Sequence, residues 1–439
     1  MTASTIDQQS DLKVRLQSMF EQYSGSLNGH RHNALLQLQK QALEQVLGME
    51  FPTRRDEDWK YTSVAPLLKQ DYREALVPAK IDPEWAALPG ITALQMVFSN
   101  GKLIERPQQL PEGLEVYTLS EALDREDLQE AVSAQLYSGK AANAFIPLNN
   151  AFNRDGLVIR LAADAVITTP LHLAYLTSPG PDPLFMHPNV LVLAGVNSQF
   201  TLIESYRLAT AVASPYFNNS VNRMVLKAGA QVQHYKLQLE GENGFQINQT
   251  SAVLGRDSVY SHFTLDLGGS LVRNNVNIHL GGENGNANLY GIYLANEKQH
   301  IDNQTFIDHA VPNCLSNELY KGIITDQARG VFNGKVLVRQ DAQKTNAYQQ
   351  NSNLVLSKTA AMDTKPQLEI FADDVKCSHG ATIGQLDEDH VFYLRTRGLN
   401  ETQARAMLQH AFLGEVGGFI GQEGIREYVN NLLSDKFAR

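Results

Sequence analysis

The feature that most constrains the fold is a long series of short, alternating segments between about residues 145 and 360. In segments such as VYSHFTLDLG (259–268) and VNIHLGG (276–282), apolar residues tend to occupy every second position, which is typical of a strand with one buried face. Gly, Asn, Asp and Pro separate these segments, and no stretch between them resembles a crossover helix. The pattern therefore excludes a doubly wound α/β fold.

Two architectures can hold this many short strands: stacked β-sandwiches, or a solenoid in which each coil packs on the next. Asparagine-rich turns such as NGNANLYG (284–291) and AYQQNSN (347–353) suit a solenoid, because amide side chains can hydrogen-bond along the stack. No strict repeat is visible. The residues alone favour the solenoid only slightly, and the sandwich stays open at this point.

Helical patterns flank the β region on both sides. Apolar residues recur with a period near 3.6 over the first 50 residues, and Thr53 followed by Asp56 predicts a further helix start. Near the C-terminus, Leu399, Asn400 and Gln403 predict a hydrophobic staple and a capping box for a helix. We therefore expect an N-terminal helical or mixed region (1–145), a β core (146–365) and a C-terminal region with helices (366–439).

The first C-terminal helix is expected to carry an apolar face. Its members are Ala404, Met407, Leu408, Ala411, Phe412 and Phe419. A second amphipathic segment follows, with Ile425, Tyr428, Val429, Leu432 and Leu433. These faces either pack on the protein's own solenoid or form a groove for another protein, and packing is favoured because most amphipathic helices serve their own core.

Charge and composition exclude several classes of function. Acidic residues outnumber basic ones by 47 to 37, a formal net charge of −10, so nucleic acid is not expected as a partner. The N-terminus lacks the pattern of a secretory signal, and no run of residues is apolar enough for a membrane span. With only two cysteines, Cys314 and Cys377, the sequence favours a reducing, cytoplasmic location.

The segment DDVKCSHGAT (373–382) carries the most suggestive chemistry. Cys377 and His379 are two residues apart, so in an extended segment both side chains address one surface. Thiolate and imidazole bind zinc, copper or iron, but two ligands do not complete a tetrahedral site, so further ligands would have to come from elsewhere or from a second chain. The imidazole is also expected to lower the pKa of the thiol, although an ordinary packed turn fits this spacing equally well.

Common catalytic patterns are missing from the sequence. It contains no GxxxxGK[ST], HExxH or GxSxG motif and no set of four cysteines. The glycine-rich stretch 281–291 lies between two strands and is interpreted as a turn. His234, His262 and His279 fall within strand patterns, where a surface or hydrogen-bonded core residue is the expected role, and Cys314 is expected to be a buried side chain.

Long motifs nevertheless resemble a known family. KTNAYQQNSNLVLS (344–357) and MDTKPQLEIFADDVKCSHGATIGQLDEDHVFYLRTRGL (362–399) resemble the signature of the SufB/SufD family of the SUF iron–sulfur cluster assembly machinery. FPTRRDEDWKYTSV (51–64) and FTLDLGGSLVRNNVNIHLGGENG (263–285) are similar to its N-terminal and central motifs. The resemblance spans nearly the whole chain, in the right order.

The resemblance implies a mainly β protein: a right-handed parallel β-helix flanked by N-terminal and C-terminal helical regions. It also implies a non-enzymatic scaffold that pairs with SufB through the β-helix and binds the ATPase SufC through its C-terminal helices. Iron or a nascent cluster would be held transiently near His379 and Cys377 at the subunit interface, with no tightly bound cofactor in the isolated chain. A homodimer in isolation is a further expectation, because an unpaired solenoid flank exposes an edge.

Two departures from the SufB pattern indicate the SufD branch of the family. Gly380 replaces the glutamate of the SufB sequence HEAT, and Leu394 follows Phe392 and Tyr393 where SufB often carries a cysteine. Cluster chemistry would then be carried mainly by the partner. The alternative function is a β-helix carbohydrate-active enzyme, a lyase or hydrolase, which would require an export signal and a groove of catalytic residues.

Overall fold

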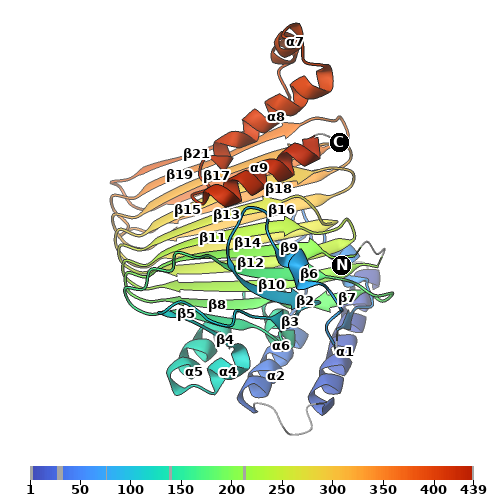
Figure 1. The fold of residues 1–439 in the computed structure, drawn as a ribbon, viewed down its shortest axis with the longest axis vertical. Coiled ribbons are helices and arrows are strands. Elements are labelled where there is room, and N and C mark those ends of the chain that lie inside the picture. Colours follow the sequence, from blue (N-terminus) through green and yellow to red (C-terminus); the bar gives the residue numbers. More distant parts are fainter. Residues whose placement is uncertain (1–2, 27–32, 76, 138–140, 211–213, 438–439) are drawn as a thin grey trace.

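The computed structural model describes residues 3–26, 33–75, 77–137, 141–210 and 214–437. Figure 1 shows a tall stack of strands, with helices around its N-terminal end and against one side near its C-terminal end. No helix within these ranges is both long enough and apolar enough to cross a bilayer.

Two sheets form the stack, and from β8 onward successive strands alternate between them. The first sheet runs in the order β4 (Leu114–Thr118), β5 (Leu157–Leu161), β8 (Asn189–Ala194), β10 (Tyr216–Leu226), β12 (Gly244–Leu254), β14 (Leu271–Leu280), β16 (His300–His309), β18 (Arg329–Val338) and β20 (Ala361–Ile370), with β7 (Leu184–Met186) beside β10 and β1 (Arg73–Glu74) beside β7. The second runs in the order β3 (Lys102–Glu105), β2 (Leu94–Ser99), β6 (Leu171–Thr177), β9 (Gln199–Leu208), β11 (Gln231–Leu239), β13 (Val259–Asp266), β15 (Asn286–Ala295), β17 (Leu315–Ile324), β19 (Asn346–Val355) and β21 (Lys376–Gly384).

This order is that of a parallel β-solenoid. From β5 and β6 onward neighbouring strands in each sheet are parallel, because each coil adds one strand to each sheet, while β2–β3 and β4–β5 pair antiparallel at the N-terminal end. The predicted mainly β solenoid with helices on both sides is therefore confirmed, and the sandwich is excluded. Its right-handed sense stays a prediction.

The solenoid extends further along the chain than predicted. The expected limit at residue 365 lies inside β20, which continues the register of β18, and β21 continues that of β19. No residue of these two strands is fully buried, since no further coil stacks on them. At the other end, β2, β3 and β4 show that the region 1–145 also contributes strands to both sheets.

Asparagine and aspartate shape the corners of the coils. Asn197, Asp257 and Asn284 are among the non-glycine residues with positive φ, a conformation that these two residue types tolerate better than others. The corners are also linked along the stack: Asn197 donates to Asp164 at 2.9 Å, and Asn284 donates to Asp257 at the same distance. The turn that contains Asn284 thus links neighbouring coils, but the prediction of a turn at AYQQNSN (347–353) is wrong: this segment lies inside a strand, residues 346–355, where Asn353 donates to Asn351 at 2.7 Å.

The interior of the solenoid combines an apolar core with buried polar groups. His234 hydrogen-bonds Glu204 at 2.7 Å and Tyr260 at 2.9 Å, and all three are buried, as expected for a satisfied core histidine. His262 is also buried, and burial holds its pKa well below the usual value. His279 is partly exposed and pairs with Asp308 at 2.9 Å.

Helices cover the N-terminal half of the first sheet. They are α1 (Ala3–Ser26), α2 (Asn33–Gly48), α3 (Ala65–Leu68), α4 (Leu119–Leu123), α5 (Glu126–Val132) and α6 (Phe145–Phe152), with single turns at η1 (Glu57–Trp59) and η3 (Ser133–Tyr137). A further short turn, η2 (Pro83–Ala86), packs on the second sheet instead. The helix start predicted at Thr53 is wrong: Asp56 accepts from the Thr53 backbone N–H at 2.7 Å, and only the one-turn η1 follows.

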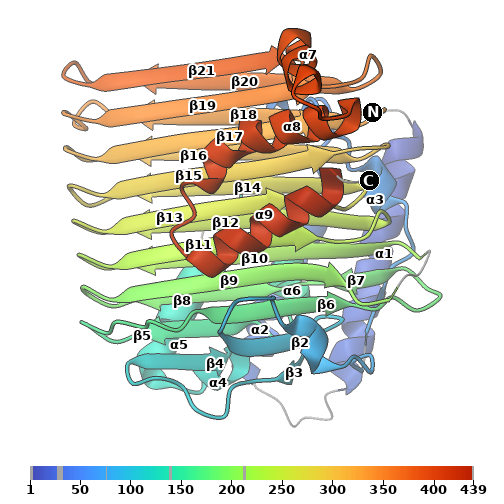
Figure 2. The ribbon, with the colours of Figure 1, turned by 45° about the horizontal axis from the view of Figure 1, so that its top comes forward.

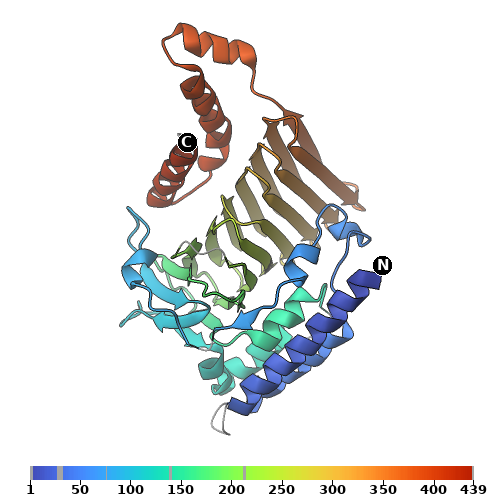
Figure 3. The same cartoon turned by 90° about the vertical axis from the view of Figure 1, so that its right-hand side faces the viewer.

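Three helices follow the last strand: α7 (Glu388–Thr396), α8 (Glu401–Gly417) and α9 (Glu423–Phe437). The predicted capping box is confirmed, since Asn400 accepts from the backbone N–H of Gln403 at 2.8 Å while the Gln403 side chain accepts from that of Asn400 at 3.1 Å. Figures 2 and 3 show α8 and α9 against the outer face of the second sheet. Leu413 and Val416 are buried there, so packing on the protein's own solenoid, the favoured alternative, is confirmed for these helices.

Candidate metal or cluster site at the open end of the solenoid

The solenoid ends in two edge strands. Within the described chain β20 pairs only with β18, and β21 pairs only with β19. Large apolar side chains are exposed around these edges: Tyr348, Ile370, Phe371 and Ile383, with exposed fractions between 40 and 63%. Unpaired parallel edges beside exposed apolar groups are typical of a surface that pairs with another chain. We call this surface, formed by β20 and β21, the open end.

Cys377 and His379 both lie on β21 and face the same side. Their partners in register are Ala347 and Gln349, which are buried inside the solenoid, while Tyr348 between them is 48% exposed. Cys377 and His379 therefore occupy positions that continue the interior, but with no coil above them. His379 is exposed and Cys377 is half-buried against the core.

A buried polar pair lies beneath His379. Gln349 donates to the carboxylate of Glu318 at 2.7 Å, and both side chains are buried. Burial raises the pKa of Glu318 to about 7, although hydrogen bonds from Thr305 and Gln349 act in the opposite direction. The Gln349 amide fits because Gly334 has no side chain: a Cβ there would lie 2.3 Å from its Nε2.

Gln349 and Glu318 are not recognisable as part of the site from the sequence. The only signal was their position: each shares the inward side of its strand with apolar or small residues such as Ala347. A polar residue on the inward side of a strand is buried. From the sequence alone it is not known which side of the strand faces inward, so this burial could not be predicted.

The two potential ligands of the open end do not make a complete metal site. Among the described residues no group of three or more His, Cys, Asp or Glu side chains could hold a metal ion. The expected lowering of the thiol pKa is wrong, because burial against the core raises the pKa of Cys377 while a hydrogen bond with the backbone of Ala347 only partly opposes this. The residues present thus fit half of a coordination sphere.

The apolar face predicted on α8 is divided between two environments. Ala404 is fully buried and Leu408 is partly buried. Phe412 packs against the second sheet, where the Lys321 ammonium lies 4.5 Å from its ring centroid and donates to its carbonyl at 2.9 Å. Met407, by contrast, is 56% exposed, and Ala411 is exposed beside it.

Met407 and Ala411 line an open cavity of about 690 Å³ between α8 and α9. Its other walls are His410, Asn400, Thr402, Gln403, Ala406, Ser434 and Phe437. This cavity, together with Met407, is the part of the predicted helix face that remains available to another molecule.

Comparison with known proteins agrees with this architecture. A family model described as the SufBD core domain of the SUF system for FeS cluster assembly matches residues 176–412, and one described as the SufBD N-terminal region matches residues 10–173. A SufBD family iron–sulfur cluster assembly protein of Synechocystis is 34% identical over 93% of this chain and 92% of its own length. The iron–sulfur cluster assembly protein SufD of Escherichia coli is 31% identical over 89% of this chain and 90% of its own. Solenoid, flanking helices and sequence similarity together show that the chain belongs to the SufBD family of the SUF system, as a homologue of SufD.

Proposed function

We propose that this protein is a non-catalytic scaffold subunit of a cytoplasmic iron–sulfur cluster assembly complex, and that it pairs with SufB through the open end. The observation that carries the proposal is the open end itself. Its two edge strands offer unpaired backbone groups to a second solenoid, and Ile383 and Phe371 supply apolar surface beside them. A second solenoid stacked there would bury both.

The same docking would complete the site of Cys377 and His379. Both side chains lie on the last coil, which a docked solenoid would cover, so partner residues could supply the ligands that this chain lacks. Iron or a nascent cluster is here the cargo. A half-site suits transient holding, because the cargo must leave when the subunits separate or rearrange.

We further propose that the ATPase SufC binds at the cavity between α8 and α9 and along the exposed side of α8. Met407 is a large apolar side chain that is 56% exposed in the described chain. Exposed large apolar side chains often mark surfaces on which another protein docks. Ala411 lies beside it in the same cavity. The buried Ala404 and the packed Phe412 would act indirectly, by fixing the position of α8.

In the absence of SufB, the open end could pair with a second copy of this chain. The chemistry of an unpaired parallel edge does not distinguish a copy from a related solenoid. Self-association is therefore expected to compete with SufB for the same surface.

One experiment tests the assembly. The chain is mixed with SufB and SufC from one organism, and the mass of the product is measured by size-exclusion chromatography with light scattering. A complex that contains all three proteins supports the proposal. Separate elution of the three proteins at micromolar concentration contradicts it, provided that SufB and SufC still bind each other in the same buffer.

A further inference from the structure

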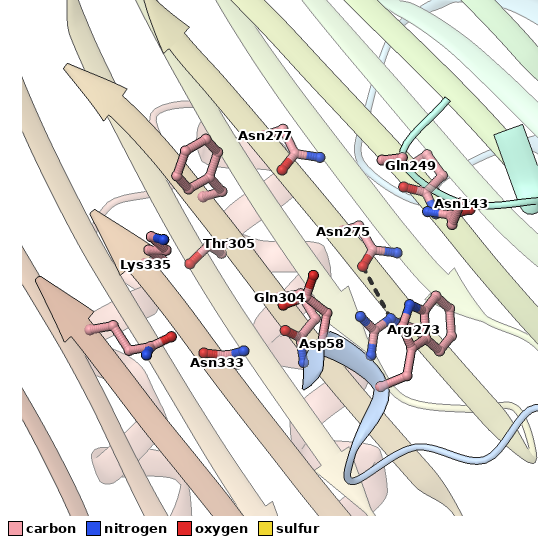
Figure 4. A pocket seen from close by; sticks show the side chains of 14 residues that line it. Asp58, Asn143, Gln249, Arg273, Asn275, Asn277, Gln304, Thr305, Asn333 and Lys335 are labelled. Atoms are coloured by element: carbon pink, nitrogen blue, oxygen red, sulfur yellow. Dashed lines mark hydrogen bonds between the residues drawn. The ribbon is translucent and has the colours of Figure 1, made fainter. Parts of the chain in front are cut away.

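Three of the motifs that carry the family resemblance meet at one pocket, whose lining includes neither Cys377 nor His379. Asp58 and Trp59 come from the N-terminal motif, Arg273 and Asn275 from the central one, and Gln367 from the last. The pocket has a volume of about 310 Å³ and lies on the outer face of the first sheet (Figure 4). Gln367 lies on β20, at the rim of the open end, but neither the holding of iron or a cluster by Cys377 and His379 nor the docking of SufC, as proposed above, uses the pocket.

One wall of this pocket is held rigidly. The guanidinium of Arg273 lies 3.6 Å from the ring centroid of Trp59 and donates to Asp302 at 2.5 Å and to Asn275 at 3.1 Å. The Thr62 hydroxyl also donates to Asp302. Arg273, Trp59 and Asp302 are all buried, so the wall is organised before any ligand arrives.

A ladder of amide side chains forms the floor. Gln249, Asn275, Gln304 and Asn333 are in register on β12, β14, β16 and β18, so successive amides recur about every 4.8 Å. Gln249 is only 5% exposed, yet its Nε2 has no hydrogen-bond partner among the described residues, and neither has the buried Oδ1 of Asn333. A donor at one end of the ladder and an acceptor at the other are thus left for a ligand.

The charges of the pocket are largely compensated by its own surroundings. Arg273 pairs with Asp302, and Lys335 pairs with Glu369 at 2.8 Å. An anion would therefore compete with carboxylates already in place. Amides both donate and accept, as do hydroxyl groups, and the partly buried Phe306 offers an apolar surface to the C–H groups of a sugar ring.

We propose that this pocket binds a neutral, polyhydroxylated ligand about two sugar rings long, which would reach along the amide ladder from Gln249 to Asn333. The ligand is bound and not cleaved, because Asp58 is the only carboxylate among the described lining residues and glycoside hydrolysis requires a pair. This inference is independent of the scaffold function, so either can fail without the other.

The test is calorimetric titration of the full-length protein with maltose and cellobiose, supported by saturation-transfer NMR. Saturable binding is expected for at least one disaccharide. Asn333→Leu and Gln249→Met should each weaken it about threefold to tenfold, the effect of one lost hydrogen bond. Asn317→Leu is the matched control, since Asn317 on β17 belongs to an amide pair with Asn288 on the opposite sheet and should leave binding unchanged.

Three results would overturn the inference. Binding of sulfate or citrate in preference to both sugars would reassign the pocket to anions held by Arg273 and Lys335. If neither maltose nor cellobiose showed saturable binding, the pocket would contain only water and would not be a sugar site. Equal weakening by Asn317→Leu would show a general effect on the solenoid. Asn333 is not fully buried, so Asn333→Leu should keep the native melting temperature and remains informative if Gln249→Met does not fold.

Discussion

Gln349 lies directly beneath His379: the two residues are paired in register across β19 and β21, and one is buried while the other faces solvent. The amide of Gln349 is in turn bound to Glu318, one strand further in. His379 is therefore the outermost member of a polar row that continues into the solenoid. This placement is what makes its imidazole accessible to a partner and its removal harmless to packing.

Replacing His379 by Ala should leave complex formation intact and reduce the amount of iron or cluster retained by the complex. The exposed side chain contributes a ligand and little packing, so the melting temperature should change by no more than a degree or two, in keeping with a surface substitution. Iron analysis and the visible absorbance of the purified complex measure the effect. His390→Ala, at another exposed histidine on α7, is the control, and equal loss of iron in both variants would remove His379 from the site.

Introducing a charge at the open end should prevent pairing. Ile383→Asp places a carboxylate on β21, where a docked solenoid would bury it, so association with SufB and self-association should both weaken by tenfold or more. Light scattering over a concentration series measures both equilibria. Val253→Asp makes the same change at a 43% exposed valine in the middle of the stack, and it should have no effect; a complex that survives Ile383→Asp would place the interface elsewhere.

Two substitutions on α8 should separate docking from folding. Met407→Asp is expected to weaken SufC binding by tenfold or more, with an unchanged melting temperature, because Met407 is exposed. Phe412→Ala removes a ring packed against Lys321 and the sheet, and it should cost about 1 to 3 kcal/mol of stability. Surface plasmon resonance and thermal denaturation report the two effects. If Met407→Asp bound SufC normally, the cavity between α8 and α9 would not be the docking site.

Glu318 should make stability depend on pH. Its pKa in the folded protein, about 7, lies above the usual value of 4.5, so the folded state binds more protons than the unfolded state between these values. The contribution of Glu318 to stability is then fully present below about pH 4.5 and is lost as pH rises through 7. Glu318→Gln stays neutral throughout: its free energy of unfolding should match the wild type near pH 4.5 and exceed it at pH 8 by up to about 3 kcal/mol. A difference that is the same at pH 4.5 and pH 8 would contradict this prediction.

Much of the fold could be predicted because its determinants are local. Alternating segments such as 259–268 identify strands, and the absence of crossover helices excludes α/β folds. The choice between sandwich and solenoid depended on the family resemblance, since coils without a strict repeat leave no period to detect. The limit at residue 365 was placed too early because β20 and β21 lack the buried apolar alternation of earlier strands, which follows from their position at the end of the stack.

The candidate site was predicted less completely. The common orientation of Cys377 and His379 follows from their spacing, but the direction of the thiol pKa depends on the packing of Cys377 against the core. Likewise, the periodicity of α8 identifies Met407 and Phe412 as one face. The contact of Phe412 with Lys321 joins residues 91 apart in the sequence, so it could not be predicted from the helix pattern. This contact holds Phe412 against the sheet, whereas Met407 on the same helix stays exposed.

The attachment of the N-terminal segment also constrains how the chain folds. Thr62 is hydrogen-bonded to Asp302, which is 240 residues away, and Glu57 is paired with Lys365 across 308 residues. During synthesis this segment leaves the ribosome long before the strands that carry Asp302 and Lys365 are made. It can therefore dock only after most of the coils have been synthesised. We expect it to be the last element to dock, and the nascent chain to need protection from premature association until it does.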